Sequence, residues 1–395
     1  MAKQLEITDA APLARFQQRA LMVGIVGLAA GALGGFMDPG QLLRSWLVAF
    51  LFCVGLTLGS LALLMLQHLS GGQWGMVSRR VFEAATRTIP FVALCFVPVL
   101  IGLPTLFEWA RPEAADNAII QAKAGYLNTS FFIVRGVVFF AFWTVCVFLL
   151  NRWSAEQDTG QATTPADSVR FRKVSAPGLL FLVITVTLAS VDWVMSLDPE
   201  WFSTIFGLIT IQGWGLTALA LTIVVLSKLT DVAPFSDFLT KRHFHDLGKL
   251  LLAFVMLWAY LNFSQFLIIW SGNLPEEIPW YVRRTTGNWG YVAIALVLGH
   301  FAIPFTLLLS QDLKKRPALL ARVATFIIAM RLVDLIWLVV PEFRSGGLLI
   351  HWMDLAVPVG LTGIWLFLFA RNLRSRALLP LNDPYFKEAF AHEAH

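Results

Sequence analysis

The chain has 395 residues, of which 57% are hydrophobic and only 14% are charged, and its formal net charge is +5. Soluble domains carry roughly 25% charged residues, so this composition excludes an ordinary soluble protein and predicts an all-α polytopic membrane protein. The positive charge does not indicate nucleic-acid binding, because Lys and Arg gather on one side of the bilayer in such chains.

Ten apolar stretches are near or above the ~20 residues that a transmembrane helix needs. They are 20–36, 41–69, 82–104, 128–151, 177–197, 200–227, 246–271, 288–310, 317–340 and 348–370. A four-span unit returns the chain to its starting side, so we expect two four-helix bundles, spans two to five and six to nine, related by a parallel repeat. The predicted division is 1–40 for the N-terminal segment and first span, 41–197 and 198–340 for the two bundles, and 341–395 for the tenth span and tail.

Basic residues are distributed unevenly between the loops on the two sides. The loops on one side hold most of the Lys and Arg residues, and those on the other hold only Arg44, Arg111, Lys123, Arg283, Arg284 and Arg344. By the positive-inside rule both termini are expected to be cytoplasmic.

Three connections between spans carry local signals. Residues 105–127 mix aromatic and polar side chains, which predicts an interfacial helix. Residues 154–170 are polar and are expected to form a flexible loop. Asp198-Pro199 has the pattern of an N-cap followed by proline at the first helical position, which predicts that a helix begins there, after a tight hairpin.

Ionisable residues within the spans form two layers with one histidine between them. Glu83, Arg87, His245, Asp246 and Lys249 belong to the predicted cytoplasmic layer, with His68 and His243. The outer layer contains Arg135, Asp192, Arg331, Asp334, His351 and Asp354. His300 stands near mid-membrane. Such a series of acids, bases and one imidazole is what a proton relay needs, because histidine exchanges protons near neutral pH.

The same residues also have simpler interpretations. Arg331 and Asp334, three residues apart, form a pair that can neutralise itself. Glu83–Arg87 and Asp246–Lys249 have the spacing of helix-end ion pairs.

The positions of three histidines and one acid suggest a separate interpretation for each. His245 lies at a helix start, and His351 has the spacing to cap its helix with Asp354. Asp192 and His300 have no obvious partner within one turn of their own helices, so each is expected to find one on another span.

No metal or cofactor site is predicted on this chain. Cys53, Cys95 and Cys146 stand singly in apolar runs, without the spacing of a zinc or iron–sulfur site. No two histidines have the matched depth in the bilayer that a bis-histidine haem requires, apart from His68 and His245 at the rim. The glycines of residues 71–75 are not followed by the Lys-Ser/Thr of a phosphate-binding loop.

Four stretches together resemble a known family. They are LQHLSGGQWGMVSRRVFEA (66–84), SVDWVMSLDPEWFSTIFG (190–207), HDLGKLLLAFVMLWAYLNFSQFLIIWSGNLPEE (245–277) and RLVDLIWLVVPEF (331–343). They are similar to the second NrfD-type, polysulfide-reductase-like membrane subunit (ActF type) of bacterial alternative complex III, over about residues 15–372.

The resemblance implies a cofactor-free subunit of a quinol:cytochrome c, or quinol:acceptor, oxidoreductase in the bacterial cytoplasmic (inner) membrane. Its implied partners are the second NrfD-like subunit, an iron–sulfur protein, haem c subunits, small membrane subunits and lipid, with haem c and iron–sulfur clusters on those partners and quinol as the substrate of the complex. The chain itself has no implied catalytic residue. The family suggests proton half-channels, which we assign as a hypothesis to Asp192, His300, Arg331 and Asp334.

Three alternatives stay open. Arg135, Asp192 and Trp193 near the outer face could line a quinone pocket. Repeats and buried ionisable residues also occur in secondary transporters, although the prolines are not matched between the two halves. A purely structural scaffold with neutralised ion pairs is the third.

Overall fold

The protein is an all-helical, multi-pass membrane protein. The computed structural model describes residues 11–160, 164–344 and 350–386, and these ranges contain helices and no strand. Nine helices in them are long and apolar enough to cross a membrane. They are α1 (Ala11–Met37), α2 (Pro39–Ser70), α7 (Thr129–Asp158), α8 (Pro165–Trp193), α9 (Phe206–Lys228), α11 (Lys241–Gly272), the continuous run of α13 (Gly287–Leu296), the π-helical η5 (Val297–Ala302) and α14 (Ile303–Leu309), α16 (Pro317–Val339), and α17 (Met353–Arg374).

Shorter helices connect the long ones. They are α3 (Gln73–Thr86), α4 (Ile89–Ile101), α5 (Leu103–Leu106), η2 (Glu108–Ala110), η3 (Pro112–Asp116), α6 (Ala118–Ala122), η4 (Met195–Leu197), α10 (Phe235–Phe238), α12 (Ile278–Thr285), α15 (Gln311–Lys314) and η6 (Val340–Glu342). Side chains fix several helix starts. Asp38 accepts a hydrogen bond from the Gln41 amide before α2, and Asn128 accepts one from the Phe131 amide before α7.

The expected third span, 82–104, is broken. Its residues divide between α3 and α4, which are bent by 42° relative to each other, so the described chain has nine candidate spans, or ten if this pair crosses as one. Pro90 explains the break. Proline lacks the N–H that would bond to the Thr86 carbonyl oxygen, and its ring clashes with that carbonyl in a continuous helix, so Pro90 is accommodated in the first turn of α4.

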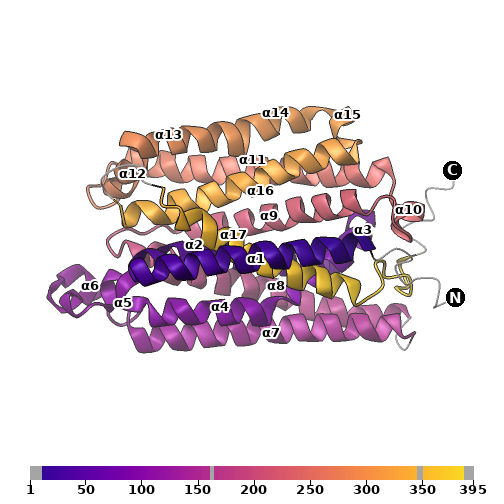
Figure 1. Ribbon diagram of the computed structural model, residues 1–395, viewed down its shortest axis with the longest axis horizontal. Helices are drawn as coiled ribbons and strands as arrows, with labels where there is room; N and C mark the ends of the chain where they lie inside the picture. Colours follow the sequence, from indigo (N-terminus) through magenta and orange to yellow (C-terminus); the bar gives the residue numbers. More distant parts are fainter. Residues whose placement is uncertain (1–10, 161–163, 345–349, 387–395) are drawn as a thin grey trace.

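The helices lie side by side along one direction (Figure 1). α2 is the central element and the most deeply buried of the nine candidate spans in the described chain, and it packs against α4, α8, α9 and α17. α4 and α8 both contact α7, while α9 contacts α11 and α16. α1 lies along α17, where Gly27 and Gly360 let the backbones approach: a Cβ on Gly27 would be 2.6 Å from the Gly360 Cα.

The start of α1 and the end of α17 lie at the same end of the molecule, where Arg374 donates to Gln17 at 2.7 Å. We call this the terminal end; α3, α10 and α15 lie there as well, while α5, α6 and α12 lie at the far end (Figure 1).

Three predicted connections differ from the structure. The prediction that a helix begins at Asp198-Pro199 is wrong, because α9 begins at Phe206. Asp198 accepts instead from the Glu200 amide at 3.2 Å and is paired with Arg283 of α12. These contacts hold residues 198–205 outside a helix, so the hairpin is wider than expected.

The flexible loop expected at 154–170 is largely helical. α7 continues to Asp158 and α8 starts at Pro165, because Thr164 and Asp167 form a capping box; residues 161–163 lie outside the described chain. The interfacial helix expected at 105–127 is also wrong, since that stretch forms the separate short helices η2, η3 and α6, with the end of α5.

Candidate functional site

The most complete ion pair inside the helices joins α7 to α8 near the far end. Arg135 donates from Nε to Asp192 Oδ2 and from Nη2 to Oδ1, both at 2.8 Å. Arg135 is 6% exposed and Asp192 1%. The third guanidinium donor, Nη1, bonds to the Tyr126 carbonyl oxygen at 2.9 Å. The sequence predicts that Asp192 has a partner on another helix, and that partner is Arg135.

Aromatic rings enclose this pair. The Arg135 Cζ lies 3.8 Å from the Tyr126 ring centroid and 4.3 Å from that of Phe131. Tyr126 is in the loop before α7, and burial raises the pKa of its phenol, with a further contribution from the Asp192 charge. Both rings contribute cation–π attraction to the Arg135 guanidinium.

The predicted quinone-binding residues have other contacts. Asp192 and Arg135 are bonded to each other, and the Trp193 indole packs 5.0 Å from Phe50 and 5.3 Å from Phe96, measured between ring centroids. Trp193 is 1% exposed. Quinone binding here stays a prediction, and its entry would require these side chains to move.

His300 lies in the one-turn π-helix η5, between α13 and α14. Its side chain is fully buried, and its ring centroid is 4.3 Å from that of Trp258 on α11. Neither Nδ1 nor Nε2 has a hydrogen-bond partner among the described residues. Because π-helical turns and unsatisfied buried polar groups both concentrate at functional sites, His300 is the strongest single candidate in the molecule.

An ion pair on α16 lies beside this histidine. Arg331 donates from Nη1 to Asp334 Oδ2, and the Trp258 indole N–H donates to the same oxygen at 3.4 Å. Arg331 and Asp334 are 2% and 3% exposed. Helix α16, which carries the pair, packs against η5. Trp258 therefore contacts both His300 and the ion pair, and we call these four residues the His300 cluster.

Gly213 on α9 makes room for the His300 cluster. A Cβ on this glycine would lie 2.7 Å from the Arg331 Cζ and 2.9 Å from both of its terminal nitrogens. The missing side chain is what allows the guanidinium to lie against α9.

A second polar network lies at the terminal end, and its pairing differs from the expected one. Glu83 does not take Arg87, one turn on, as its closest partner. It accepts from Arg79 Nε at 2.8 Å and from Arg80 Nη1 at 2.7 Å. Arg87 terminates α3 and donates to Ser375 Oγ at 2.9 Å, beyond α17. The bend after α3 directs Arg87 away from Glu83.

The segment after α17 folds back over this network. Asp383 accepts from Arg79 Nη1 at 2.7 Å, and Asn382 donates to the Gln157 carbonyl oxygen at 3.0 Å. Leu378 and Leu379 are 1% and 0% exposed. Residues 375–386 therefore form part of the packed structure at the terminal end.

The remaining predicted pair lies at the protein surface. Lys249 bonds to Asp246 at 3.2 Å in the first turns of α11, and the two side chains are 58% and 39% exposed. His245 lies in the same turns, as expected of a helix-start residue. An exposed pair of this kind contributes little to stability. The structure does not join it to the His300 cluster.

The sequence did not identify a cluster at the far end. Arg284 of α12 is 1% exposed, donates to Glu342 at 2.6 Å and stacks with its Cζ 3.7 Å from the Trp280 ring centroid. Trp280 in turn lies 4.3 Å from Trp201 with nearly parallel rings. Burial lowers the pKa of Arg284 to about 10, and Glu342 opposes that shift. From the sequence, Arg284 is recognisable only as one of the few basic residues in the loops on the less basic side of the predicted bundle.

Asp354 is another buried acid, and three parts of the chain donate hydrogen bonds to its carboxylate. Asp354 accepts from Gln41 at 2.6 Å and Ser45 at 2.7 Å on α2, and from Arg344 at 2.9 Å. It also accepts from the His351 amide at 2.9 Å, while His351 Nδ1 accepts from the Met353 amide at 3.3 Å. His351 and Asp354 thus cap the start of α17, as their spacing predicts.

Within residues 11–160, 164–344 and 350–386, the polar groups therefore form separate clusters, and the hydrogen bonds there do not link them into one continuous chain. Arg135–Asp192 belongs to helices α7 and α8, and the His300 cluster to α11, η5 and α16. No group of three or more His, Cys, Asp or Glu side chains within the described ranges is arranged to hold a metal ion. Comparison with known sequences adds no assignment, since no family model matches the chain and no curated protein matches it either.

Proposed function

We propose that this chain is an integral subunit of a bacterial quinol-oxidising complex that passes electrons to a cytochrome c or another acceptor, and that it conducts protons through the His300 cluster. The resemblance of four sequence stretches to the NrfD-type subunits of alternative complex III supports the first part. The multi-pass, all-helical architecture agrees with it. In this proposal the haem c and iron–sulfur centres belong to partner subunits, and the chain is not catalytic alone.

The proposed arrangement is two four-helix bundles flanked by α1 and α17, with both termini in the cytoplasm. The packing of α2, α4, α7 and α8 around one another, and of α9, α11, α14 and α16, supports the two bundles. The orientation is supported by the basic residues, since Arg79, Arg152, Arg172 and Lys315 belong to segments at the terminal end.

The observation that carries the proton proposal is the state of His300. A relay residue must accept a proton on one ring nitrogen and release it from the other, so both nitrogens need to be available to exchange partners. In the described chain both nitrogens of this buried imidazole are without a protein hydrogen bond.

A structural scaffold is the second candidate, and the Arg135–Asp192 pair favours it. Both carboxylate oxygens are bonded and the charge is neutralised, which is sufficient to join two helices without proton transfer. The two candidates therefore differ most clearly at His300, which is not tied in this way.

Two measurements test the proposal separately. Mild-detergent purification through a tag on this chain is expected to recover partners with haem c and iron–sulfur spectra. Recovery of the chain alone, or as a homo-oligomer, contradicts the complex assignment.

The second measurement is proton release per quinol oxidised in vesicles containing the purified complex. His300→Gln is expected to lower it while the complex remains assembled, and His351→Asn, which retains a helix-capping side chain, is the control. Unchanged release in assembled His300→Gln complex rejects proton conduction and leaves the scaffold.

A further inference from the structure

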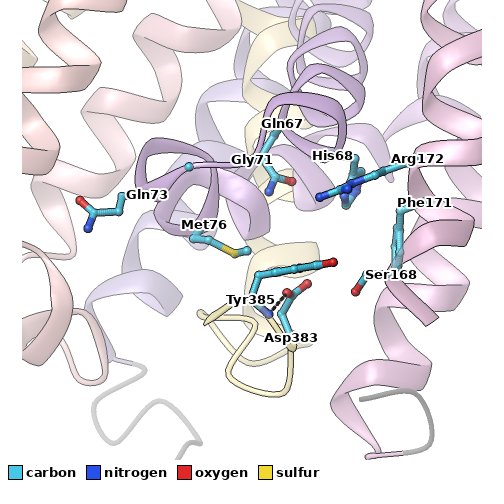
Figure 2. Close-up of a pocket in the computed structure, with 11 residues that line it drawn as sticks. Gln67, His68, Gly71, Gln73, Met76, Ser168, Phe171, Arg172, Asp383 and Tyr385 are labelled. Carbon is cyan, nitrogen blue, oxygen red and sulfur yellow. Dashed lines mark hydrogen bonds between the residues drawn. The ribbon is translucent and has the colours of Figure 1, made fainter. Parts of the chain in front are cut away.

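A cavity of about 450 Å³ opens at the terminal end, between α2, the start of α3, α8 and the segment after α17. Figure 2 shows Gln67 and His68 at the end of α2, Ser168 and Arg172 on α8, and Asp383 and Tyr385 on the returning segment, arranged around it. None of these residues belongs to the His300 cluster.

Three residues that line this cavity each have a buried polar atom without a hydrogen-bond partner in the described chain. These atoms are Gln67 Oε1, His68 Nε2 and Ser168 Oγ. Their residues are 3%, 9% and 8% exposed. Buried polar groups are nearly always hydrogen-bonded. Three such groups from two helices, all lining one cavity, indicate a polar ligand.

The start of α3 adds backbone donors at the same place. Gly71 and Gly72 have φ values of 68° and 94°, which glycine adopts without strain, and they turn the chain directly into α3. No side chain caps the first turn of this 14-residue helix. The uncapped amides and the helix dipole favour a negatively charged group.

The charges of the lining side chains also favour an anion. Arg172 is exposed at the rim, with its Cζ 5.4 Å from the Tyr385 ring centroid. Asp383 is the acid in the lining, and its charge is neutralised by Arg79 at 2.7 Å. The His68 imidazole stacks on the Phe171 ring, with the two ring centroids 4.6 Å apart, and this contact holds the imidazole in place. Among the described residues, the cavity lining thus holds one cation without a carboxylate partner, together with several donors.

We infer that this cavity binds a phosphate group, with the phosphodiester of an anionic lipid head group as its source in the membrane. Ser168 and His68 each provide a donor, and a flip of the Gln67 amide presents its NH₂ in place of the oxygen. The cavity lies where α2 and α8 reach the terminal end, and basic pockets between helices near the membrane surface suit anionic lipid head groups. A soluble phosphate ester offers the same oxygens. This inference is independent of the quinol-complex assignment.

The test is binding to the purified, intact chain in detergent, measured calorimetrically with three probes. They are short-chain phosphatidylglycerol, the corresponding diacylglycerol without phosphate, and inorganic phosphate. Saturable binding of phosphatidylglycerol but not of diacylglycerol is expected. Competition by millimolar inorganic phosphate supports a soluble source of the same chemistry, and its absence supports the lipid.

Variants connect binding to the cavity. Arg172→Gln and His68→Phe, which keeps the ring stacked on Phe171, are each expected to weaken phosphatidylglycerol binding about tenfold, since each removes a hydrogen bond to a charged group. Lys173→Gln removes the neighbouring exposed cation outside the cavity lining and is expected to change nothing.

Ser168→Ala provides an independent variant if His68→Phe does not remain monodisperse. Equal binding of the lipids with and without phosphate overturns the inference. The inference is also overturned if Arg172→Gln binds phosphatidylglycerol with full affinity and either His68→Phe or Ser168→Ala does so too.

Discussion

Arg135 on α7 and Asp192 on α8 face each other through two parallel hydrogen bonds of 2.8 Å, with both side chains almost completely buried. The same two helices are also joined by the Arg170–Glu156 ion pair at 2.7 Å and by the hydrogen bond from Trp143 to Thr185 at 2.9 Å. A charged group in this setting is tolerated only with its partner.

Replacing one member of this pair is therefore expected to lower the free energy of unfolding more than replacing both members does. Asp192→Asn or Arg135→Gln should each lower the free energy of unfolding by about 3 kcal/mol, because an uncompensated buried charge or unpaired donors remain. The double variant should lose less than the sum of the two single losses. Unfolding with dodecyl sulfate in mixed micelles measures these values. Additive losses, or single losses below about 0.5 kcal/mol, would show that the pair is not coupled.

Gly213→Ala is expected to disturb the His300 cluster from a position outside it. The new Cβ would lie 2.7 Å from the Arg331 Cζ, so the guanidinium must move from its place beside Asp334. We expect a loss of about 1–3 kcal/mol, typical of overpacking. Gly272→Ala is the matched control, since its Cβ would meet nothing within 4 Å. The same unfolding measurement applies, and equal stability of the two variants contradicts the close packing of Arg331 against α9.

His300→Phe is expected to separate stability from function. A buried imidazole without hydrogen bonds carries a desolvation cost, and a phenyl ring of similar shape removes that cost and keeps the contact with Trp258. The melting temperature should stay the same or rise, by the equivalent of about 1 kcal/mol, while proton release falls. A clear fall in melting temperature would show that the imidazole has an essential bonding partner.

The pH dependence of stability is expected to report on Tyr126. Burial raises the pKa of this phenol, so above its ordinary value of about 10 the unfolded tyrosine loses its proton while the folded one retains it. The folded state then binds more protons, and stability falls as pH increases. Tyr126→Phe should reduce this alkaline loss of stability. Phe131→Leu, which alters the other ring over Arg135 without removing a titratable group, should not. An identical alkaline profile in Tyr126→Phe and the unmodified protein contradicts the assignment.

Nine of the ten predicted spans correspond to long apolar helices in the described chain, because hydropathy is the main signal for segments that enter the bilayer, and the predicted third span is divided between α3 and α4. Local signals were less reliable wherever a distant residue competed with them. Asp198-Pro199 has a good helix-start pattern, yet Arg283, 85 residues away, takes the carboxylate. The capping box of Thr164 and Asp167 was visible in the sequence and outweighs the polar composition around it.

The candidate site was only partly predictable for a related reason. Depth and charge identified Asp192, His300, Arg331 and Asp334, but hydropathy contains no information about which helices are neighbours. Trp258, which contacts both His300 and Asp334, looked like any other indole in an apolar helix.

The contact between Asp383 and Arg79 has a consequence for biogenesis. The ribosome delivers α3 early and residue 383 only after every described helix has been translated. Until then the guanidinium of Arg79 lacks one of its two carboxylate partners. The polar network on α3 is therefore completed by a segment that follows α17, and this contact can form only after translation has passed through all the described helices.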